Sequence, residues 1–99
     1  MMRIVWDDQV AIDLDGIWSY IAKDNVRYAD RVFARLRSGI TQLELFPEIG
    51  RIGRVPETRE LVYPDLPYIA IYSLTETEDA VTILRVVHTA RYYPPKSGG

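Results

Sequence analysis

Two neighbouring segments with apolar side chains at helical spacing constrain the fold of this chain more than any other feature. The short separation between them, from Lys23 to Val26, predicts two helices folded back on each other as an antiparallel hairpin. Asp7 or Asp8 can cap the first helix and Asn25 the second, because their side-chain oxygens accept free amides of a first turn. The two stripes are Val10, Leu14, Ile17, Trp18 and Ile21, then Ala29, Val32, Phe33, Leu36, Ile40 and Leu43.

The helical pattern stops at Phe46-Pro47, because proline cannot continue a helix. The glycines and prolines of residues 48–57 indicate a loop. Strand-like runs occupy residues 3–6, 59–63, 68–74 and 81–87, and the last is the most apolar. The order β-α-α-β-β-β predicts an α+β fold in which the helix hairpin packs on a small, mostly antiparallel sheet. We expect one domain over residues 1–93 and a flexible tail over residues 94–99.

Composition excludes several classes of site. The 99 residues contain no cysteine and one histidine, His88, so we expect no disulfide, no metal site and no cofactor. No apolar run approaches the roughly 20 residues that span a bilayer, and the N-terminus lacks a signal-peptide pattern. We therefore expect no membrane association and a cytoplasmic location. A net charge of −2 argues against non-specific coating of nucleic acid.

Several motifs stand in a fixed order along the chain. They are Asp13-Leu14, Tyr20-Ile21-Ala22, Leu43…Phe46-Pro47…Gly50-Arg51, Thr58-Arg59-Glu60-Leu61, Pro67 to Tyr72, and Ile83 to Pro94. With these motifs the chain resembles the RelE/ParE superfamily of type II toxin–antitoxin toxins over nearly its whole length. The resemblance implies a growth inhibitor that a cognate antitoxin neutralises, and it implies one of two activities. RelE-like members cleave messenger RNA in the ribosome, whereas ParE-like members inhibit DNA gyrase.

Arg85, His88, Arg91 and Tyr92 are the candidate catalytic residues if the chain is a nuclease. RNA cleavage by the 2′-hydroxyl needs a base, an acid and a cation on the phosphate, which suits histidine and arginine. Arg91 and Tyr92 match the position of catalytic or RNA-stacking residues in ribosome-dependent members. A structural role is the alternative for each, with Arg85 either on the solvent side of the sheet or paired with Glu60.

One departure from the RelE-like pattern favours the gyrase interpretation. Many RelE-like nucleases carry a basic residue beside the aromatic that opens the third strand, whereas here Pro67-Tyr68-Ile69-Ala70 has none. Tyr68 and Tyr72 are expected to pack in the sheet. Arg51, Arg54 and Arg59 make the second half of the chain locally basic and are predicted to bind the target, either gyrase or ribosome-bound messenger RNA. A toxin fold that has lost its activity is a third, more distant possibility.

The antitoxin is the expected partner, and the resemblance implies that a segment of it folds onto the toxin. We expect that segment to contact the helical hairpin, or the groove between hairpin and sheet, and to cover part of the basic face. The predicted contacts are Leu14, Trp18, Val32 and Leu36. Operator DNA is expected to be bound only through the antitoxin, because this chain has no pattern of a groove-reading helix.

Overall fold

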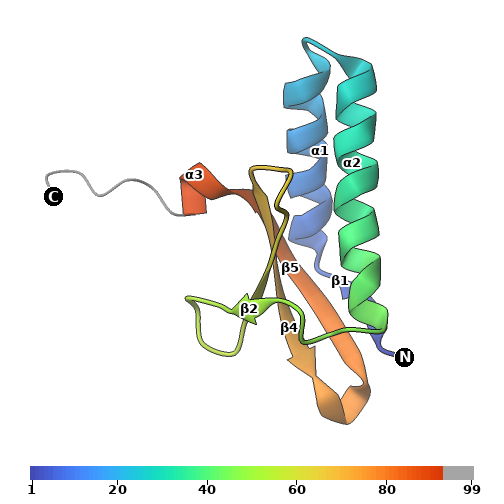
Figure 1. Ribbon diagram of the computed structural model, residues 1–99, viewed down its shortest axis with the longest axis vertical. Coiled ribbons are helices and arrows are strands. Elements are labelled where there is room, and N and C mark those ends of the chain that lie inside the picture. The colour runs from blue at the N-terminus through green and yellow to red at the C-terminus, as the bar shows by residue number, and fades with distance from the viewer. Residues whose placement is uncertain (93–99) are drawn as a thin grey trace, which may run out of the picture.

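The computed structural model describes residues 1–92, and the predicted flexible tail at 94–99 lies outside this range. Ten elements follow one another in this part of the chain (Figure 1). Both predicted helices and all four predicted strand runs are present, which confirms the α+β architecture. The elements are β1 (Arg3–Trp6), α1 (Asp8–Ala22), α2 (Val26–Thr41), the 3₁₀ turn η1 (Gln42–Glu44), β2 (Arg51–Ile52), β3 (Arg59–Val62), β4 (Tyr68–Thr75), the 3₁₀ turn η2 (Glu76–Glu78), β5 (Ala80–His88) and α3 (Thr89–Tyr92).

Each long helix begins at a predicted cap. The Asp7 carboxylate accepts the Gln9 amide at 2.9 Å, and the Asn25 side chain accepts the Tyr28 amide at 2.9 Å. At its other end α2 tightens into η1, a common way to finish a helix. The helical stretch therefore stops at Glu44, shortly before Pro47.

The sheet has five strands in the order β1-β5-β4-β3-β2, and only the β1–β5 pair is parallel. The predicted loop at 48–57 contains the short edge strand β2, which pairs with β3. A β-bulge interrupts the β4–β5 ladder, where Ile71 lies opposite Arg85 but Tyr72 lies opposite Ile83. Leu84 is thus an extra residue in β5, and the alternation of side chains along this strand changes there.

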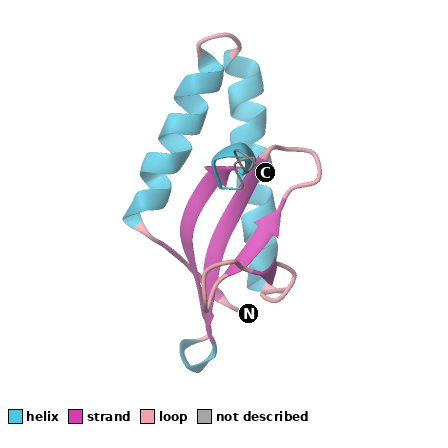
Figure 2. Cartoon of the chain, turned by 90° about the vertical axis from the view of Figure 1, so that its left-hand side faces the viewer, coloured by secondary structure: helices cyan, strands magenta, loops and turns pink. Residues whose placement is uncertain are grey.

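The hairpin covers one face of the sheet, while α3 and the β2–β3 loop lie in front of the other (Figure 2). Leu36, Ile40, Tyr72 and Ile83 form the centre of the core between hairpin and sheet, each essentially without exposed surface. Tyr68 and Tyr72 pack in the sheet as predicted, and both belong to this core. None of the described helices is long and apolar enough to cross a membrane.

Two buried tyrosines fasten the loops to this core. The Tyr72 hydroxyl donates to the Pro47 carbonyl at 2.7 Å and accepts the Gly50 amide at 2.9 Å. The Tyr63 hydroxyl donates to the Leu36 carbonyl at 2.6 Å. Burial raises the pKa of both phenols, so they stay neutral and keep their donor protons. The segment from η1 to β2 is therefore held by side-chain hydrogen bonds rather than by a strand ladder.

Candidate functional site

Arg85 pairs with Asp13 of α1 and not with Glu60, so that predicted alternative for Arg85 is wrong. Its Nε and Nη2 donate to the two carboxylate oxygens of Asp13 at 2.8 and 3.0 Å. Asp13 also accepts the Val86 amide at 3.0 Å. This amide needs a partner because β1 pairs with β5 only as far as Ile83, which leaves the edge of β5 open beyond it.

The bulge changes the alternation of side chains along β5. Arg85 follows the extra residue Leu84, and its exposed side chain reaches Asp13 of α1. Burial of the Asp13 carboxyl acts to raise its pKa, but hydrogen bonds from Arg85, Val86 and Gln9 outweigh this and lower it below 3.8. Arg85 is therefore neutralised by an ionised carboxylate, with its side chain still 47% exposed.

His88 ends β5 and is half-buried against Tyr68. The two rings meet edge to face with centroids 5.4 Å apart. The His88 Nδ1 accepts the amide of Ala90 at 3.0 Å, which holds the start of α3. Nε2 is consequently the ring nitrogen left to reach a ligand. His88 thus has the structural role that the sequence left open as an alternative, because it packs on Tyr68 and holds the first turn of α3.

Arg91 and Tyr92 belong to α3, a single helical turn that the sequence pattern did not predict. Arg91 is exposed, whereas Tyr92 is half-buried and contacts the β2–β3 loop. The Arg54 guanidinium lies 5.1 Å from the centroid of the Tyr92 ring and donates to the Tyr92 carbonyl. Three of the four candidate catalytic residues therefore point to different partners: Arg85 to α1, His88 to β4, and Tyr92 to the β2–β3 loop.

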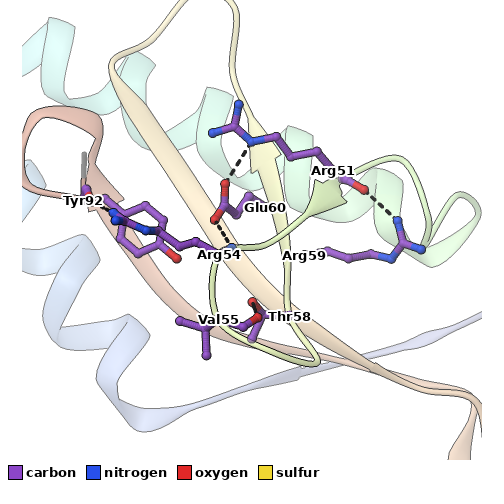
Figure 3. Close-up of polar contacts among 8 residues, drawn as sticks. Arg51, Arg54, Val55, Thr58, Arg59, Glu60 and Tyr92 are labelled. Atoms are coloured by element: carbon purple, nitrogen blue, oxygen red, sulfur yellow. Dashed lines mark hydrogen bonds and ion pairs between the residues drawn. The ribbon is translucent and has the colours of Figure 1, made fainter.

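Glu60 is a buried carboxylate that sequence reasoning noticed only as a possible partner of Arg85. Its side chain is 1% exposed on β3 and accepts the Arg51 Nε at 2.9 Å (Figure 3). It also accepts the backbone amide of Arg54 at 3.1 Å. A buried charge is tolerated only when it is paired and hydrogen-bonded, and both conditions hold here. Glu60 thereby ties β2 and the β2–β3 loop to β3.

The three arginines predicted to bind the target all make contacts within the chain. Arg59 donates to the carbonyls of Glu48 and Gly50 at 3.2 and 2.8 Å, and so holds the loop before β2 in place. Arg51 neutralises Glu60, and Arg54 covers Tyr92. The guanidinium groups of these three arginines therefore already contact a carboxylate, backbone carbonyls and an aromatic ring of the same chain.

The predicted antitoxin contacts need a correction. Val32 and Leu36 are buried in the core between the hairpin and the sheet, so in this fold their side chains are not available to a partner. Leu14 also packs in this core, but part of its side chain lines the groove between the helices. Their stripe is apolar because it packs against the chain's own sheet. Trp18 alone of the four is half-exposed, and its Nε1 donates to Asp30 of α2 at 2.8 Å.

Trp18 lines a shallow groove of about 500 Å³ between the two helices. Phe33 contributes a second aromatic ring, and the carboxylates of Asp15 and Asp30 supply negative charge. Phe33 was visible in the sequence as part of the stripe of the second helix, but its position beside Trp18 required the register of the hairpin. The described residues contain no group of three acidic or histidine side chains placed to hold a metal ion.

The family model described as "ParE toxin of type II toxin-antitoxin system, parDE" matches residues 4–93. This chain belongs to the ParE toxin family. Two named toxins agree with that membership. The Sinorhizobium fredii protein named "Putative toxin Y4kP" is 40% identical over 92 residues, covering 93% of both chains. "Toxin RelE2" of Caulobacter vibrioides is 31% identical over 91 residues, covering 92% of this chain and 99% of that one. The resemblance to the RelE/ParE superfamily is therefore confirmed.

Solved structures share the fold of this ParE-family toxin. A chain of the chromosomal ParDE system from P. aeruginosa superposes with a TM-score of 0.78 at 24% identity, covering 89% of this chain and 96% of that chain. A chain of the intact E. coli RelBE complex gives 0.68 at 12% identity, with coverage of 89% and 96%. ParE- and RelE-type structures thus share one architecture, and the choice between activities depends on side chains.

Proposed function

We propose that this ParE-family toxin stops growth by inhibiting DNA gyrase and that it does not cut RNA. The observation that carries this proposal is the bidentate pair between Arg85 and Asp13. RNA cleavage requires a cation aimed at the phosphate on which charge develops. The planar fork that would contact the phosphate oxygens of RNA already holds a carboxylate of the same geometry. Arg85 thus serves the fold rather than a phosphate.

The face of the sheet opposite the hairpin is also poorly suited to an RNA backbone. Glu60 places a buried negative charge there, and the Arg51 guanidinium that a phosphate would approach already neutralises it. Arg54 and Tyr92 stack on each other across the same face. A phosphodiester would have to displace both arrangements before it reached the sheet, whereas inhibition through protein contact needs neither to move.

The test compares the two activities directly with purified full-length toxin. We expect it to inhibit ATP-dependent supercoiling by gyrase and to leave messenger RNA intact in a translating extract. If messenger RNA is cut in the extract and supercoiling is undisturbed, the gyrase proposal is wrong. The RelE-like alternative, which uses Arg85, His88 and Arg91, would then hold. An unrelated folded protein at the same concentration serves as the control for non-specific loss of supercoiling.

We further propose that a cognate antitoxin neutralises this toxin and seats an amphipathic segment in the groove between α1 and α2. The half-exposed rings of Trp18 and Phe33 supply apolar contact area, and Asp15 and Asp30 suit basic residues at the edge of that segment. Any operator DNA would be bound by the antitoxin. This proposal keeps Leu14 and Trp18, which line the groove, and drops Val32 and Leu36, which the fold buries.

A substitution in the groove tests this partner. Trp18→Ala is expected to weaken antitoxin binding by about tenfold or more, as truncation of a central aromatic usually does. Cells that express both proteins should then stop growing. Ile12→Ala is the matched control, because Ile12 is a 65% exposed apolar residue of the same helix that does not line the groove. If the antitoxin bound Trp18→Ala and Ile12→Ala with equal affinity, the proposal that it binds in the groove would be wrong.

A further inference from the structure

Aromatic and basic side chains from five elements gather at the end of the sheet where β5 runs into α3. Both views show the helix hairpin extending well past this end, while α3 follows β5 on the side of the sheet away from the hairpin (Figures 1 and 2). We call this surface the aromatic end. It consists of Tyr20 of α1, Tyr28 and Arg31 of α2, Tyr68 of β4, His88 of β5 and Arg91 of α3.

Tyr68 is the centre of the aromatic end. Its ring is buried against the edge of His88, its cross-strand partner. Burial raises the pKa of the Tyr68 phenol, Tyr28 and Tyr20 raise it further, and Arg91 opposes them. Tyr20, Tyr28 and Arg91 are therefore all within electrostatic reach of the Tyr68 hydroxyl, although they come from three different helices.

The outer members of the aromatic end are exposed and do not belong to the core. Tyr20 is 72% exposed and Tyr28 is 43% exposed. The guanidinium of Arg31 lies 5.8 Å from the centroid of the Tyr28 ring and is itself exposed. Exposed tyrosines and arginines grouped around a buried aromatic have the composition of an interface hot spot, where rigid rings supply contact area at low entropic cost.

The charge of the aromatic end indicates what kind of surface it fits. Arg31 and Arg91 supply positive charge, and His88 and the three phenols supply hydrogen-bond donors. Two acids of the helices are engaged elsewhere, Asp13 with Arg85 and Asp30 with Trp18. The groove proposed for the antitoxin has the opposite character, since two carboxylates line it. Surfaces of opposite charge favour different partners.

We propose that the aromatic end is the surface through which this toxin holds its target protein, and that it fits an acidic patch on gyrase. This assignment rests on the proposed gyrase function. It moves target recognition away from Arg51, Arg54 and Arg59, whose side chains make contacts within the chain. Tyr20 and Tyr28 provide the contact area, and Arg91 provides the charge.

The test measures gyrase inhibition by purified full-length variants. The paired variant Tyr20→Ala/Tyr28→Ala is expected to inhibit supercoiling about 10- to 30-fold less effectively than wild type. Arg91→Glu should show a loss of similar size, while Arg91→Lys should retain most inhibition. Ile12→Ala is the matched control on the same hairpin, and all variants are checked for an unchanged circular dichroism spectrum. Because Arg91 is exposed on the surface, its variants remain informative even if the paired tyrosine variant unfolds.

The outcomes separate this inference from the proposed function. If wild type inhibits gyrase and the paired variant and Arg91→Glu inhibit it equally well, the surface assignment is wrong and the gyrase function stands. If wild type leaves supercoiling untouched, the gyrase function fails and the surface assignment fails with it. If the variants lose affinity for a single-stranded RNA oligonucleotide while gyrase inhibition is unchanged, the aromatic end binds nucleic acid and the inference is overturned.

Discussion

Asp13 and Arg85 lie 72 residues apart in the chain and form a two-pronged ion pair between α1 and the edge of β5. The same carboxylate accepts the Val86 amide, which β1 is too short to pair. One acidic side chain thus completes the sheet, joins it to the helix hairpin and occupies the arginine on which a nuclease interpretation would depend. Stability and function can therefore be tested at the same pair.

Removing the Asp13 carboxylate is expected to destabilise the fold. Its side chain is only 7% exposed, and its loss leaves the Val86 amide and the Arg85 guanidinium without their partner. Hydrogen bonds to charged groups contribute about 1.5–3 kcal/mol, so Asp13→Ala should lower the free energy of unfolding by about that amount in urea denaturation. Asp15→Ala, at an exposed position on the same helix, should change it by less than about 0.5 kcal/mol. Equal effects of the two substitutions would contradict this role.

The contribution of Asp13 should depend on pH in a defined direction. Burial alone would raise the pKa of this carboxyl, but Arg85, Val86 and Gln9 lower it below the ordinary value of 3.8. A carboxyl whose pKa is lower in the folded state than in the unfolded state stabilises the fold at any pH above its unfolded-state pKa. This stabilisation is lost as the pH falls through the folded-state pKa. The stability difference between wild type and Asp13→Asn should be constant above about pH 5 and shrink below pH 3.8. If the stability difference between wild type and Asp13→Asn grew on acidification, the pKa of Asp13 would be raised in the folded state and not lowered.

Two helical glycines should respond oppositely to alanine. A Cβ on Gly16 would meet no atom within 4 Å, and alanine in a helix is favoured over glycine by about 0.5–1 kcal/mol. A Cβ on Gly39 would lie 2.8 Å from the Tyr63 hydroxyl oxygen and closer still to its ring. Gly16→Ala should therefore raise the thermal midpoint. Gly39→Ala should lower it, because Tyr63 must move and release the Leu36 carbonyl.

The periodicity of the sequence was sufficient for the helices and for the main strands, because each of them buries one continuous apolar stripe. It did not identify Asp13 as the partner of Arg85, because an alternating pattern carries no information on which helix passes the end of β5. It did not distinguish stripe residues that face the chain's own sheet, such as Leu36, from those that face solvent. The short elements β2 and α3 depend on contacts of Glu60 and Arg54 that no local pattern encodes. The aromatic end likewise requires the fold, since its members span residues 20 to 91.

The hydroxyl of Tyr72 should contribute to the free energy of unfolding in addition to the packing of its ring. It satisfies both the Pro47 carbonyl and the Gly50 amide, and its loss leaves two backbone groups unpaired near the core. Tyr72→Phe is expected to cost about 1–3 kcal/mol of unfolding free energy and to speed hydrogen exchange of the Gly50 amide. Tyr20→Phe is the control, because Tyr20 is exposed on the hairpin. Unchanged exchange at Gly50 would show that the loop holds its place without the hydroxyl.

Arg85→Ala and Asp13→Ala together separate a structural arginine from a catalytic one. Both variants break the same ion pair and should lose similar stability, but only the first removes the guanidinium. If Arg85 serves the fold, gyrase inhibition per folded molecule should be equal in the two variants and close to that of wild type. A catalytic Arg85 predicts instead that Arg85→Ala loses about 10²- to 10³-fold of an RNA-cleaving activity that Asp13→Ala retains. Measuring supercoiling inhibition and message cleavage at a temperature where both variants remain folded therefore decides whether this arginine touches a phosphate or only the carboxylate of α1.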